Sequence, residues 1–487
     1  MLFNSIQFLF FLAFVIAIYF SIPFRFRWVL LLAASYCFYL STKPKFIVFI
    51  LLSTVITYYT GIQMGKRGSK SERKKFLFLG ILFNVGLLLV LKYYDFFGDS
   101  LNFLFAHLQM GYKIPALHLL LPVGISFYTF KSLSYCIDVY RGDQPAEKHL
   151  GHFALYVAFF PQLLAGPIER ATRFLPQVHE KFDFDYSRAT KGLRLILWGL
   201  FQKMVIADNL APLVDSVYNH PTDYQGASLA LATLFFAFQI YCDFSGYSDI
   251  AIGAAQILGY KTIENFKRPY LSGSIPEFWR RWHISLSTWL RDYLYIPMGG
   301  SRVSIPRWYF NLFIVMLICG FWHGAHWTFL IWGGLHGLYL VLSIFTQKMR
   351  RTFHQAIGLD RVPRLHHTLS VLVTFSLVCF AWIFFRANHI PDAFYIVSHL
   401  PTGWETALHV EGWLETPFLG PLRFELMIAI FSMALLIVVH LMERHGSLVD
   451  QLSERPIWLR WSIYYGTVLS ILLFGNFGFK PFIYFQF

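Results

Sequence analysis

Long stretches without a charged side chain constrain the fold of this chain more than any other feature. They include residues 1–24, 46–65, 365–385, 426–442 and 461–479. Each is close to or longer than the roughly 18–20 residues that a helix needs to cross a bilayer. Lipid offers the backbone no hydrogen-bond partner, so only helices and closed barrels span it. Because the runs are continuous rather than alternating, they predict helices.

The composition agrees with a lipid environment. Only 14% of the residues are charged and 56% are hydrophobic, whereas a soluble domain is about a quarter charged. We therefore expect an all-α polytopic membrane protein with about 10–12 transmembrane or re-entrant helices, forming a single membrane domain over residues 1–487. The first run lacks a cationic start and a small-residue cleavage pattern, so we expect it to be retained rather than cleaved as a signal peptide.

The net charge of +14 does not indicate a nucleic-acid partner, because the cations lie in short loops between apolar runs. That distribution is typical of cytoplasmic loops. Residues 66–75 read KRGSKSERKK, with six cations and one acid, and are predicted to be cytoplasmic. Three apolar segments precede them, which places the N-terminus outside. Lys43 and Lys45 do not fit this topology, because it places them outside, where basic residues are less common.

Two further basic stretches are predicted to be cytoplasmic, at 261–307 and 348–364. By contrast, no Lys or Arg lies between Arg386 and Arg423. The loop 388–423 is therefore predicted to be external. Its acids are Asp392, Glu405, Glu411 and Glu415.

The longest uncharged run, Trp308 to Gln347, is too long for one span. Its 40 residues would make a helix of about 60 Å, and both flanks are basic. We expect a pair of spans, or a broken re-entrant pair, that turns near the middle. Weak points for such a break are the glycines of this run, namely Gly320, Gly324, Gly333 and Gly334.

His323, within Gly320–Trp327, is the first candidate for chemistry. A histidine deep in a bilayer is costly and marks a functional site by default. Burial favours the neutral imidazole, which can accept a proton from a hydroxyl. A structural histidine bonded to a neighbouring helix is the alternative. His326 follows three residues later, on nearly the same face of a continuous helix, but a zinc site needs further ligands, so no metal is expected. His336 is expected to face elsewhere and to be structural.

The second candidate is the segment Glu277–Asp292. At 100° per residue, a polar stripe of Arg280, His283, Ser287 and Arg291 runs beside a second one that contains Arg281, with an apolar stripe opposite. The pattern predicts one amphipathic helix. It could simply lie at the cytoplasmic interface. It could also line a channel in which Arg280, Arg281, Arg291 and Ser287 bind the phosphates of an acyl donor, helped by Lys267 and Arg268.

The third candidate is Asp243–Asp249, which holds two acids, two serines and a tyrosine. Helix capping and packing are favoured over a polar cavity lining. No hydrolase elbow, phosphate-binding loop or dinucleotide-binding motif is present. The five cysteines form no CxxC pair and are expected to be free.

Nine segments in one order resemble the membrane-bound O-acyltransferase family, and in particular its bacterial polysaccharide-acetylating branch. They are LPVGISFYTF (121–130), SYCIDVYRGD (134–143), AFFPQLLAGPIER (158–170), GLFQKMVIAD (199–208), DFSGYSDIAIG (243–253), ENFKRPY (264–270), EFWRRWHISLSTWLRDYLYIPMGG (277–300), GFWHGAHWTFLIWGGLHG (320–337) and WIFFRA (382–387).

The resemblance implies helices around a central polar cavity, and it implies roles for two histidines. His323 would be the catalytic histidine of the WHG motif, and His283 would line the active site. Acyl transfer would run from a thioester such as acetyl-coenzyme A, a substrate rather than a bound cofactor, to an oxygen nucleophile. His323 would act as general base, and His283 would position the donor or stabilise the oxyanion. His326 departs from the family's usual pattern, and its role stays open.

The same resemblance implies a protein of the bacterial cytoplasmic (inner) membrane that exports acetyl groups. A periplasmic partner acetyltransferase would pass them to a polysaccharide such as alginate, peptidoglycan or cellulose. Alternatives are a D-alanyl transfer subunit for teichoic acids, a transporter or flippase that uses the same polar cavity, and a non-catalytic scaffold.

Overall fold

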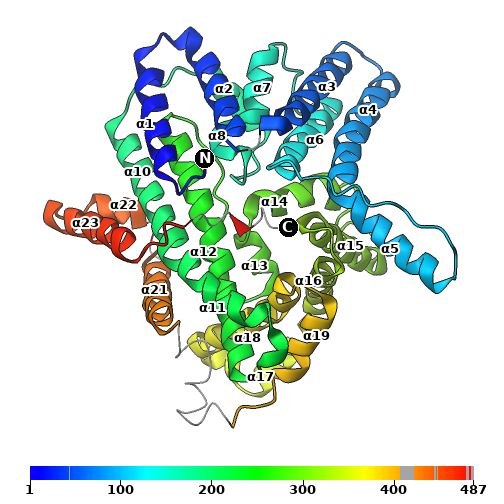
Figure 1. The fold of residues 1–487 in the computed structure, drawn as a ribbon, viewed down its shortest axis with the longest axis vertical. Coiled ribbons are helices and arrows are strands. Elements are labelled where there is room, and N and C mark those ends of the chain that lie inside the picture. The colour runs from blue at the N-terminus through cyan, green and yellow to red at the C-terminus, as the bar shows by residue number, and fades with distance from the viewer. Residues whose placement is uncertain (43, 406–421, 444–445, 447, 479–481, 484–487) are drawn as a thin grey trace. The chain divides into compact units, whose positions relative to one another are not determined.

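The computed structural model describes residues 1–42, 44–405, 422–443, 446, 448–478 and 482–483. Over these residues the secondary structure is helical and contains no strand (Figure 1). Lys43, Glu411 and Glu415 fall outside the described residues, as do all of residues 406–421 of the predicted external loop. Asp392 of that loop lies in a helix, α19 (Ile390–His399).

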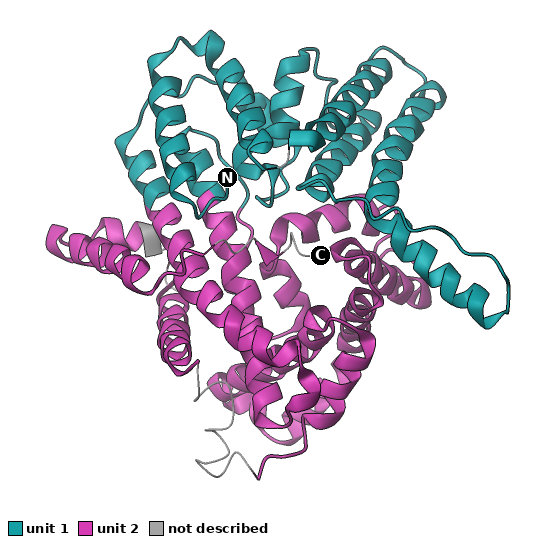
Figure 2. Cartoon of the chain, in the orientation of Figure 1, with its two compact units in different colours: residues 1–193, 251–263 teal, residues 194–250, 264–487 magenta. Residues whose placement is uncertain are grey.

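The chain divides into two compact units (Figure 2). Unit 1 contains residues 1–193 and 251–263, and unit 2 contains residues 194–250 and 264–487. The single membrane domain over 1–487 stays a prediction.

Unit 1 is built from the N-terminal helices. Its α3, α4 and α6 pack against one another, and α2 packs against α7 and α8. Buried polar side chains between α3 and α4 satisfy each other, since Ser53 donates to Asn84 at 2.6 Å and Asn84 donates to Thr57 at 3.0 Å. The helices are α1 (Ile6–Ser21), α2 (Phe24–Leu40), α3 (Ile47–Gly65), α4 (Lys70–Leu88), α5 (Tyr94–His107), α6 (Ile125–Arg141), α7 (Leu150–Ala158), α8 (Phe160–Leu163), α9 (Ala171–Val178) and the start of α10 (Tyr186–Phe201).

Unit 2 has an aromatic core in which Trp282, Trp332 and Trp382 are fully buried. The rings of Trp332 and Trp382 stack with centroids 5.6 Å apart, and the ring of Trp282 lies tilted against Trp382 at 5.1 Å. Its elements are the π-helical turn η3 (Gln202–Ala207), α11 (Asp208–Tyr218), most of α12 (Ala227–Ile257), α13 (Ile275–Arg281), α14 (Ile284–Leu290), the π-helical turn η6 (Arg291–Tyr295), α15 (Ile305–His323), α16 (Trp327–Phe345), α17 (Gln347–Ala356), α18 (Pro363–Arg386), α19, α21 (Arg423–Met442), α22 (Leu448–Ser453) and α23 (Ile457–Phe474).

Eight helical segments among the described residues are long and apolar enough to cross a membrane, and Ile6–Ser21 is a shorter apolar helix. The prediction of a helical, multi-pass membrane protein is therefore confirmed. The predicted number of 10–12 segments is larger, because it also counted shorter helices and re-entrant pieces. The eight are Pro44–Gly65, Lys70–His107, Ala227–Ile257, Ile305–His323, Trp327–Phe345, Pro363–Arg386, Arg423–Met442 and Ile457–Phe474.

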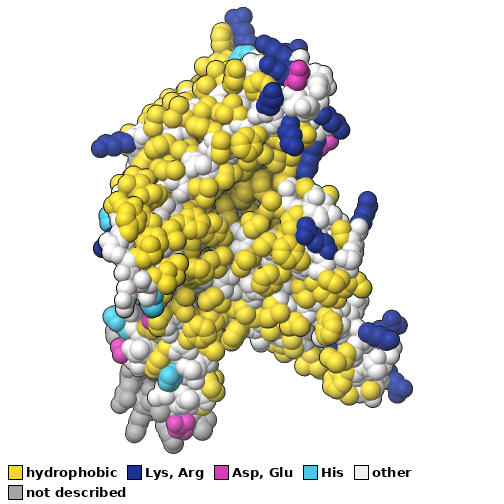
Figure 3. All heavy atoms as spheres, turned by 90° about the vertical axis from the view of Figure 1, so that its right-hand side faces the viewer, with side chains coloured by type: hydrophobic (Ala, Val, Ile, Leu, Met, Phe, Trp, Pro, Cys, Tyr) yellow, Lys and Arg dark blue, Asp and Glu magenta, His cyan; other side chains and the backbone are white. Residues whose placement is uncertain are grey.

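The surface of the molecule carries apolar side chains that water would not favour. Figure 3 shows one face on which hydrophobic side chains predominate, with Lys and Arg toward its margins. On membrane helices, Phe78 is 65% exposed and Phe431 is 72% exposed. A large exposed apolar area of this kind fits contact with lipid.

Candidate functional site

The helical hairpin α15–α16 places His323 at the end of its first helix. Helix α15 ends at His323, and α16 begins at Trp327. The two backbones touch, because a Cβ on Gly320 would lie 2.3 Å from the carbonyl oxygen of Phe329 and 2.9 Å from the Cα of Gly333. The predicted break in the run Trp308–Gln347 is therefore confirmed, and glycines make the close approach possible.

Aromatic rings surround the imidazole of His323, which is 3% exposed. The ring of Trp322 lies 4.8 Å away between centroids, that of Trp332 at 5.0 Å and that of Phe385 at 5.4 Å. The Trp332 ring stands at 90° to the imidazole. We call these three residues the aromatic cage. It keeps the imidazole away from bulk water.

A cavity of about 530 Å³ lies beside the aromatic cage and shares Phe385 with it. We call it the Lys203 cavity. His326 lines it from the N-terminus of α16, where its backbone is extended with φ −140°. The expectation that His323 and His326 share a helix face is therefore wrong, because the helix ends between them. The other polar residues that line the cavity are Lys203, Asp208, Asp215, Asn219, Gln239, Asp243, Thr328, Arg386 and Asn388.

A buried ion cluster forms one wall of the Lys203 cavity. Nζ of Lys203 lies 2.8 Å from Asp208 Oδ1 and 2.5 Å from Asp243 Oδ1, and all three side chains are almost completely buried. The other oxygen of Asp243 accepts the backbone N–H of Ile483 at 2.7 Å. Asp243 lies inside α12 rather than at its end. The favoured capping interpretation of Asp243–Asp249 is therefore wrong, and the polar-cavity alternative fits.

A second cavity, also about 530 Å³, is lined by other residues of η3 and α12. We call it the Arg268 cavity. Gln202 lines it and precedes Lys203 in η3, and Ser245 lines it and follows Asp243 by two residues in α12. Ser245 donates to Gln202, and Gln202 donates to Asp249 at 2.8 Å. A thin wall of η3 and α12 therefore separates the two cavities.

Charged side chains line the Arg268 cavity in equal numbers of each sign, three cations and three acids. Burial raises the pKa of Glu264, against the opposing effect of Lys267 and Arg268. Neutralising that carboxyl group would leave cations in excess. The cations are Arg194, Lys267 and Arg268, and the acids are Asp249, Glu264 and Glu443.

His283 lies at a break between two short helices, so the single amphipathic helix predicted over Glu277–Asp292 is wrong. Helix α13 ends at Arg281, and His283 has a left-handed backbone with φ 42°. Asn265 holds this conformation, because its carbonyl oxygen accepts the N–H of Ile284 at 2.9 Å and its side-chain oxygen lies 3.1 Å from Nδ1 of His283. A non-glycine residue in this region is strained, which is often seen at functional sites.

The imidazole of His283 is fully buried. Burial lowers its pKa to about 3, so the ring is neutral at physiological pH. Nε2 has no hydrogen-bond partner among the described residues. The ring of Trp322 lies 6.2 Å from His283 and 4.8 Å from His323, so this indole packs near both imidazoles.

The predicted donor-binding residues of α13, α14 and η6 line neither cavity. Arg280 and Arg291 are exposed. Arg281 pairs with Glu277 at 2.6 Å, and Ser287 donates to the carbonyl oxygen of Trp282 at 3.2 Å. Their role as a donor site stays a prediction. Lys267 and Arg268, named beside them, do line a cavity.

Sequence reasoning missed Arg194, Gln202 and Lys203. Lys203 could have been found, since a lysine among the apolar residues of GLFQKMVIAD is rarely buried unless it is paired. His336, expected to be structural, is fully buried and accepts the indole N–H of Trp279 at 3.3 Å. The cysteines carry no disulfide.

Comparison with known proteins places these features in context. Residues 146–359 match the family of membrane-bound O-acyltransferases, a range that includes both His283 and His323. The chain is 42% identical to the probable alginate O-acetylase AlgI of Pseudomonas aeruginosa, over 81% of this chain and 73% of that protein.

Two other relatives differ in the acceptor that their names state. The chain is 36% identical to a peptidoglycan O-acetyltransferase of Helicobacter pylori, over 76% of this chain and 72% of that protein. A teichoic acid D-alanyltransferase of Streptococcus thermophilus is 29% identical, over 54% of this chain and 68% of that protein.

Proposed function

Because the chain belongs to the membrane-bound O-acyltransferase family, we propose that it moves an acetyl group from a cytoplasmic thioester across the membrane, for O-acetylation of a polysaccharide outside. The observation that carries the proposal is the pair of cavities in unit 2 that neighbouring residues of η3 and α12 line. One of them, the Lys203 cavity, shares Phe385 with the aromatic cage of His323. One cavity would receive the donor and the other the acceptor.

The loops that contribute to each cavity support placing the Arg268 cavity on the cytoplasmic side and the Lys203 cavity on the external side. Lys267 and Arg268 of the Arg268 cavity belong to the basic stretch 261–307, predicted to be cytoplasmic. Arg386 and Asn388 of the Lys203 cavity adjoin the predicted external loop 388–423. On this topology the N-terminus lies outside, and the membrane is the cytoplasmic (inner) membrane of a bacterium.

The Arg268 cavity is the better donor site of the two. Acetyl-coenzyme A carries phosphates, and arginine and lysine are their usual partners in proteins. Arg194, Lys267 and Arg268 would bind these phosphates, while the acetyl group would reach toward the wall at Gln202 and Ser245. The predicted contributions of Arg280, Arg281, Arg291 and Ser287 would then concern the approach of the donor.

The chemical step assigns one role to each histidine. His323 takes the proton of the attacking hydroxyl group as its oxygen bonds to the acetyl carbon. The carbon–sulfur bond then breaks, and the thiolate takes up a proton and leaves as coenzyme A. His283 is neutral, and it orients the donor or, through a bridging hydroxyl or water, supports the oxyanion.

Relatives named for alginate and peptidoglycan make a polysaccharide the best acceptor class for this chain. A periplasmic partner acetyltransferase would complete the transfer to the polymer. D-alanyl transfer is the weaker alternative, because the chain is less similar to the teichoic acid enzyme and matches a smaller part of it.

The test measures thioester cleavage from labelled acetyl-coenzyme A by protein in proteoliposomes. We expect His323→Ala to abolish cleavage, whereas His367→Ala, at an exposed histidine of α18, retains it. Cleavage by His323→Ala at the wild-type rate would overturn the general base. Movement of intact solute without any cleavage would favour a transporter, and labelling only from a D-alanyl carrier would favour the teichoic acid alternative.

A further inference from the structure

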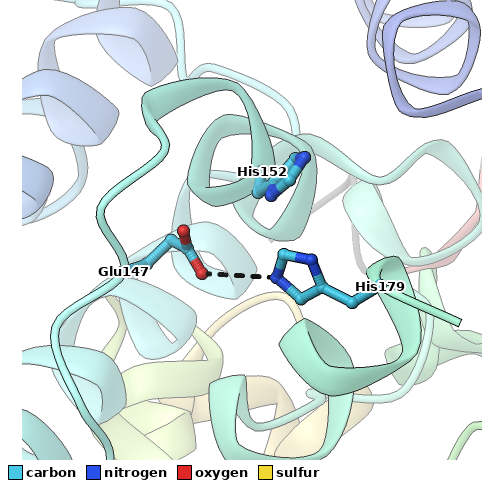
Figure 4. Close-up of side chains that lie close together, drawn as sticks. All are labelled: Glu147, His152 and His179. Atoms are coloured by element: carbon cyan, nitrogen blue, oxygen red, sulfur yellow. Dashed lines mark ion pairs between the residues drawn. The ribbon is translucent and has the colours of Figure 1, made fainter. Parts of the chain in front are cut away.

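Unit 1 brings together a carboxylate and two imidazoles that neither the acyl transfer nor the cavities of unit 2 use. Glu147 lies in the loop before α7, His152 in the first turn of α7, and His179 at the C-terminal end of α9 (Figure 4). We propose that these three residues bind a divalent transition-metal ion, and we take Zn²⁺ as the ion. The set of two histidines and one glutamate is one that zinc uses in proteins.

The geometry needs only a small contraction to hold an ion. One ligand atom from each residue lies within 4.8 Å of the other two, and Nε2 of His179 lies 3.9 Å from Oε2 of Glu147. Zinc bond lengths near 2.1 Å place tetrahedral ligand atoms about 3.4 Å apart. The side chain of His179 is 58% exposed. It therefore has room to rotate inward until its ligand atom reaches that spacing.

The chemistry of the ligand atoms also suits a metal. Metal ions bind the neutral imidazole, and burial, followed by the nearby His149 and His179, lowers the pKa of His152. Nδ1 of His152 is buried and has no hydrogen-bond partner among the described residues. An ion pair between Glu147 and His179 does not involve His152, whereas a shared metal ion would employ all three side chains.

Neighbouring groups hold Glu147 in place before any ion binds. Its backbone N–H donates to the hydroxyl of Tyr135 at 2.9 Å. Its Oε1 accepts the N–H of His149 at 2.8 Å, which leaves Oε2 for the metal. The hydroxyl of Tyr58 donates to the carbonyl of Lys148 at 2.6 Å and fixes the same loop. Such supporting hydrogen bonds orient metal ligands and raise affinity.

The position of the site indicates a structural role. It joins the loop after α6 to α7 and α9, three pieces that are separate in the sequence. Ala146 packs beside Gly65, where a Cβ would lie 2.8 Å from the alanine methyl, so the site is near the basic loop 66–75. On the topology proposed above, the ion would fasten the cytoplasmic end of unit 1.

The experiment uses the full-length protein with a streptavidin-binding tag, so that no histidine tag adds ligands. Metal-free protein in detergent receives one equivalent of Zn²⁺, is desalted, and is analysed by mass spectrometry for bound zinc. We expect close to one zinc ion per chain for the wild type, and a loss of affinity of at least about tenfold for His179→Ala and Glu147→Gln.

Two controls separate the site from misfolding and from chance binding. His179 is exposed, so His179→Ala should keep the elution profile of the wild type on size exclusion. His354 packs against His366 at 4.5 Å on the surface of unit 2, and His354→Ala should keep its zinc. Co²⁺ should give the visible absorption of a tetrahedral site in the wild type and in His354→Ala, but not in His179→Ala. Equal zinc binding by wild type and His179→Ala, or none by either, would overturn the proposal.

Discussion

Nδ1 of His283 lies 3.1 Å from the side-chain oxygen of Asn265, and this contact sets the direction in which the imidazole can act. An oxygen acceptor at Nδ1 assigns the ring proton to that nitrogen, which leaves Nε2 as an acceptor. The same oxygen of Asn265 accepts the hydroxyl of Ser285 at 2.9 Å. Asn265 therefore positions the ring without needing to touch the substrate.

Replacing Asn265 by Ala should lower kcat for acetyl transfer by up to about a hundredfold, because a displaced imidazole loses its alignment with the reacting atoms. KM for the thioester should change little. Asn265→Asp keeps an oxygen in place and should retain more of the rate. Steady-state kinetics on the three proteins check this, and equal losses in both variants would contradict a positioning role.

The buried state of His283 makes stability depend on pH. Its pKa is about 3 in the folded protein, against about 6.5 in an unfolded chain. Between these values the unfolded state binds more protons, so the free energy of unfolding falls as the pH is lowered below about 6.5. His283→Gln removes this contribution, by at most about 1.4 kcal/mol per pH unit.

Chemical unfolding in detergent between pH 8 and pH 5, compared for wild type and His283→Gln, measures the effect. The stability difference between the two proteins should decline as the pH falls. His367→Gln, at an exposed position, should track the wild type throughout. A constant difference down to pH 5 would mean that water reaches His283 in the folded protein.

The sequence was sufficient for features that depend on local pattern. The uncharged run 46–65 coincides with α3, because length and hydropathy alone decide a membrane helix. The break in Trp308–Gln347 was also predicted, since its glycines are visible in the sequence. His323 and His283 were picked out from their motifs, and the structure encloses both in aromatic surroundings.

The errors have a common physical cause in contacts between distant residues. The helix predicted over 277–292 breaks at His283, because Asn265, 18 residues earlier, captures the N–H of Ile284. Asp243 was expected to cap a helix end, but α12 continues through it because Lys203 neutralises its charge from another element. Helical periodicity carries no information about either partner.

The close contact of glycines in the α15–α16 hairpin predicts that substitutions at the neighbouring positions Gly333 and Gly334 differ strongly in their cost in stability. Gly333→Ala would place a Cβ 2.5 Å from the carbonyl oxygen of Met316, which should cost about 1–3 kcal/mol in stability. Gly334→Ala is the matched control, since its Cβ would meet only side-chain atoms at 3.8 Å or more. Thermal unfolding of both variants tests this, and equal melting temperatures would contradict the close packing.

The buried ion cluster predicts that one cation holds two acids in the core of unit 2. Lys203→Met leaves Asp208 and Asp243 buried without their cation, and breaking a buried pair typically costs about 3–5 kcal/mol. The pair of Arg386 and Asp215 lies in the same cavity at 2.6 Å, but Asp215 is 50% exposed. Asp215→Asn should therefore cost about 1 kcal/mol or less.

A compensated variant separates the effect of charge from that of packing. Lys203→Met combined with Asp208→Asn and Asp243→Asn removes the whole charged group while nearly preserving its volume, so it should recover much of the stability that Lys203→Met loses. Asparagine can still accept the N–H of Ile483 that Asp243 accepts at 2.7 Å. If the triple variant unfolds as readily as Lys203→Met, the lysine acts through packing, and the ion cluster is not what stabilises the wall between the cavities.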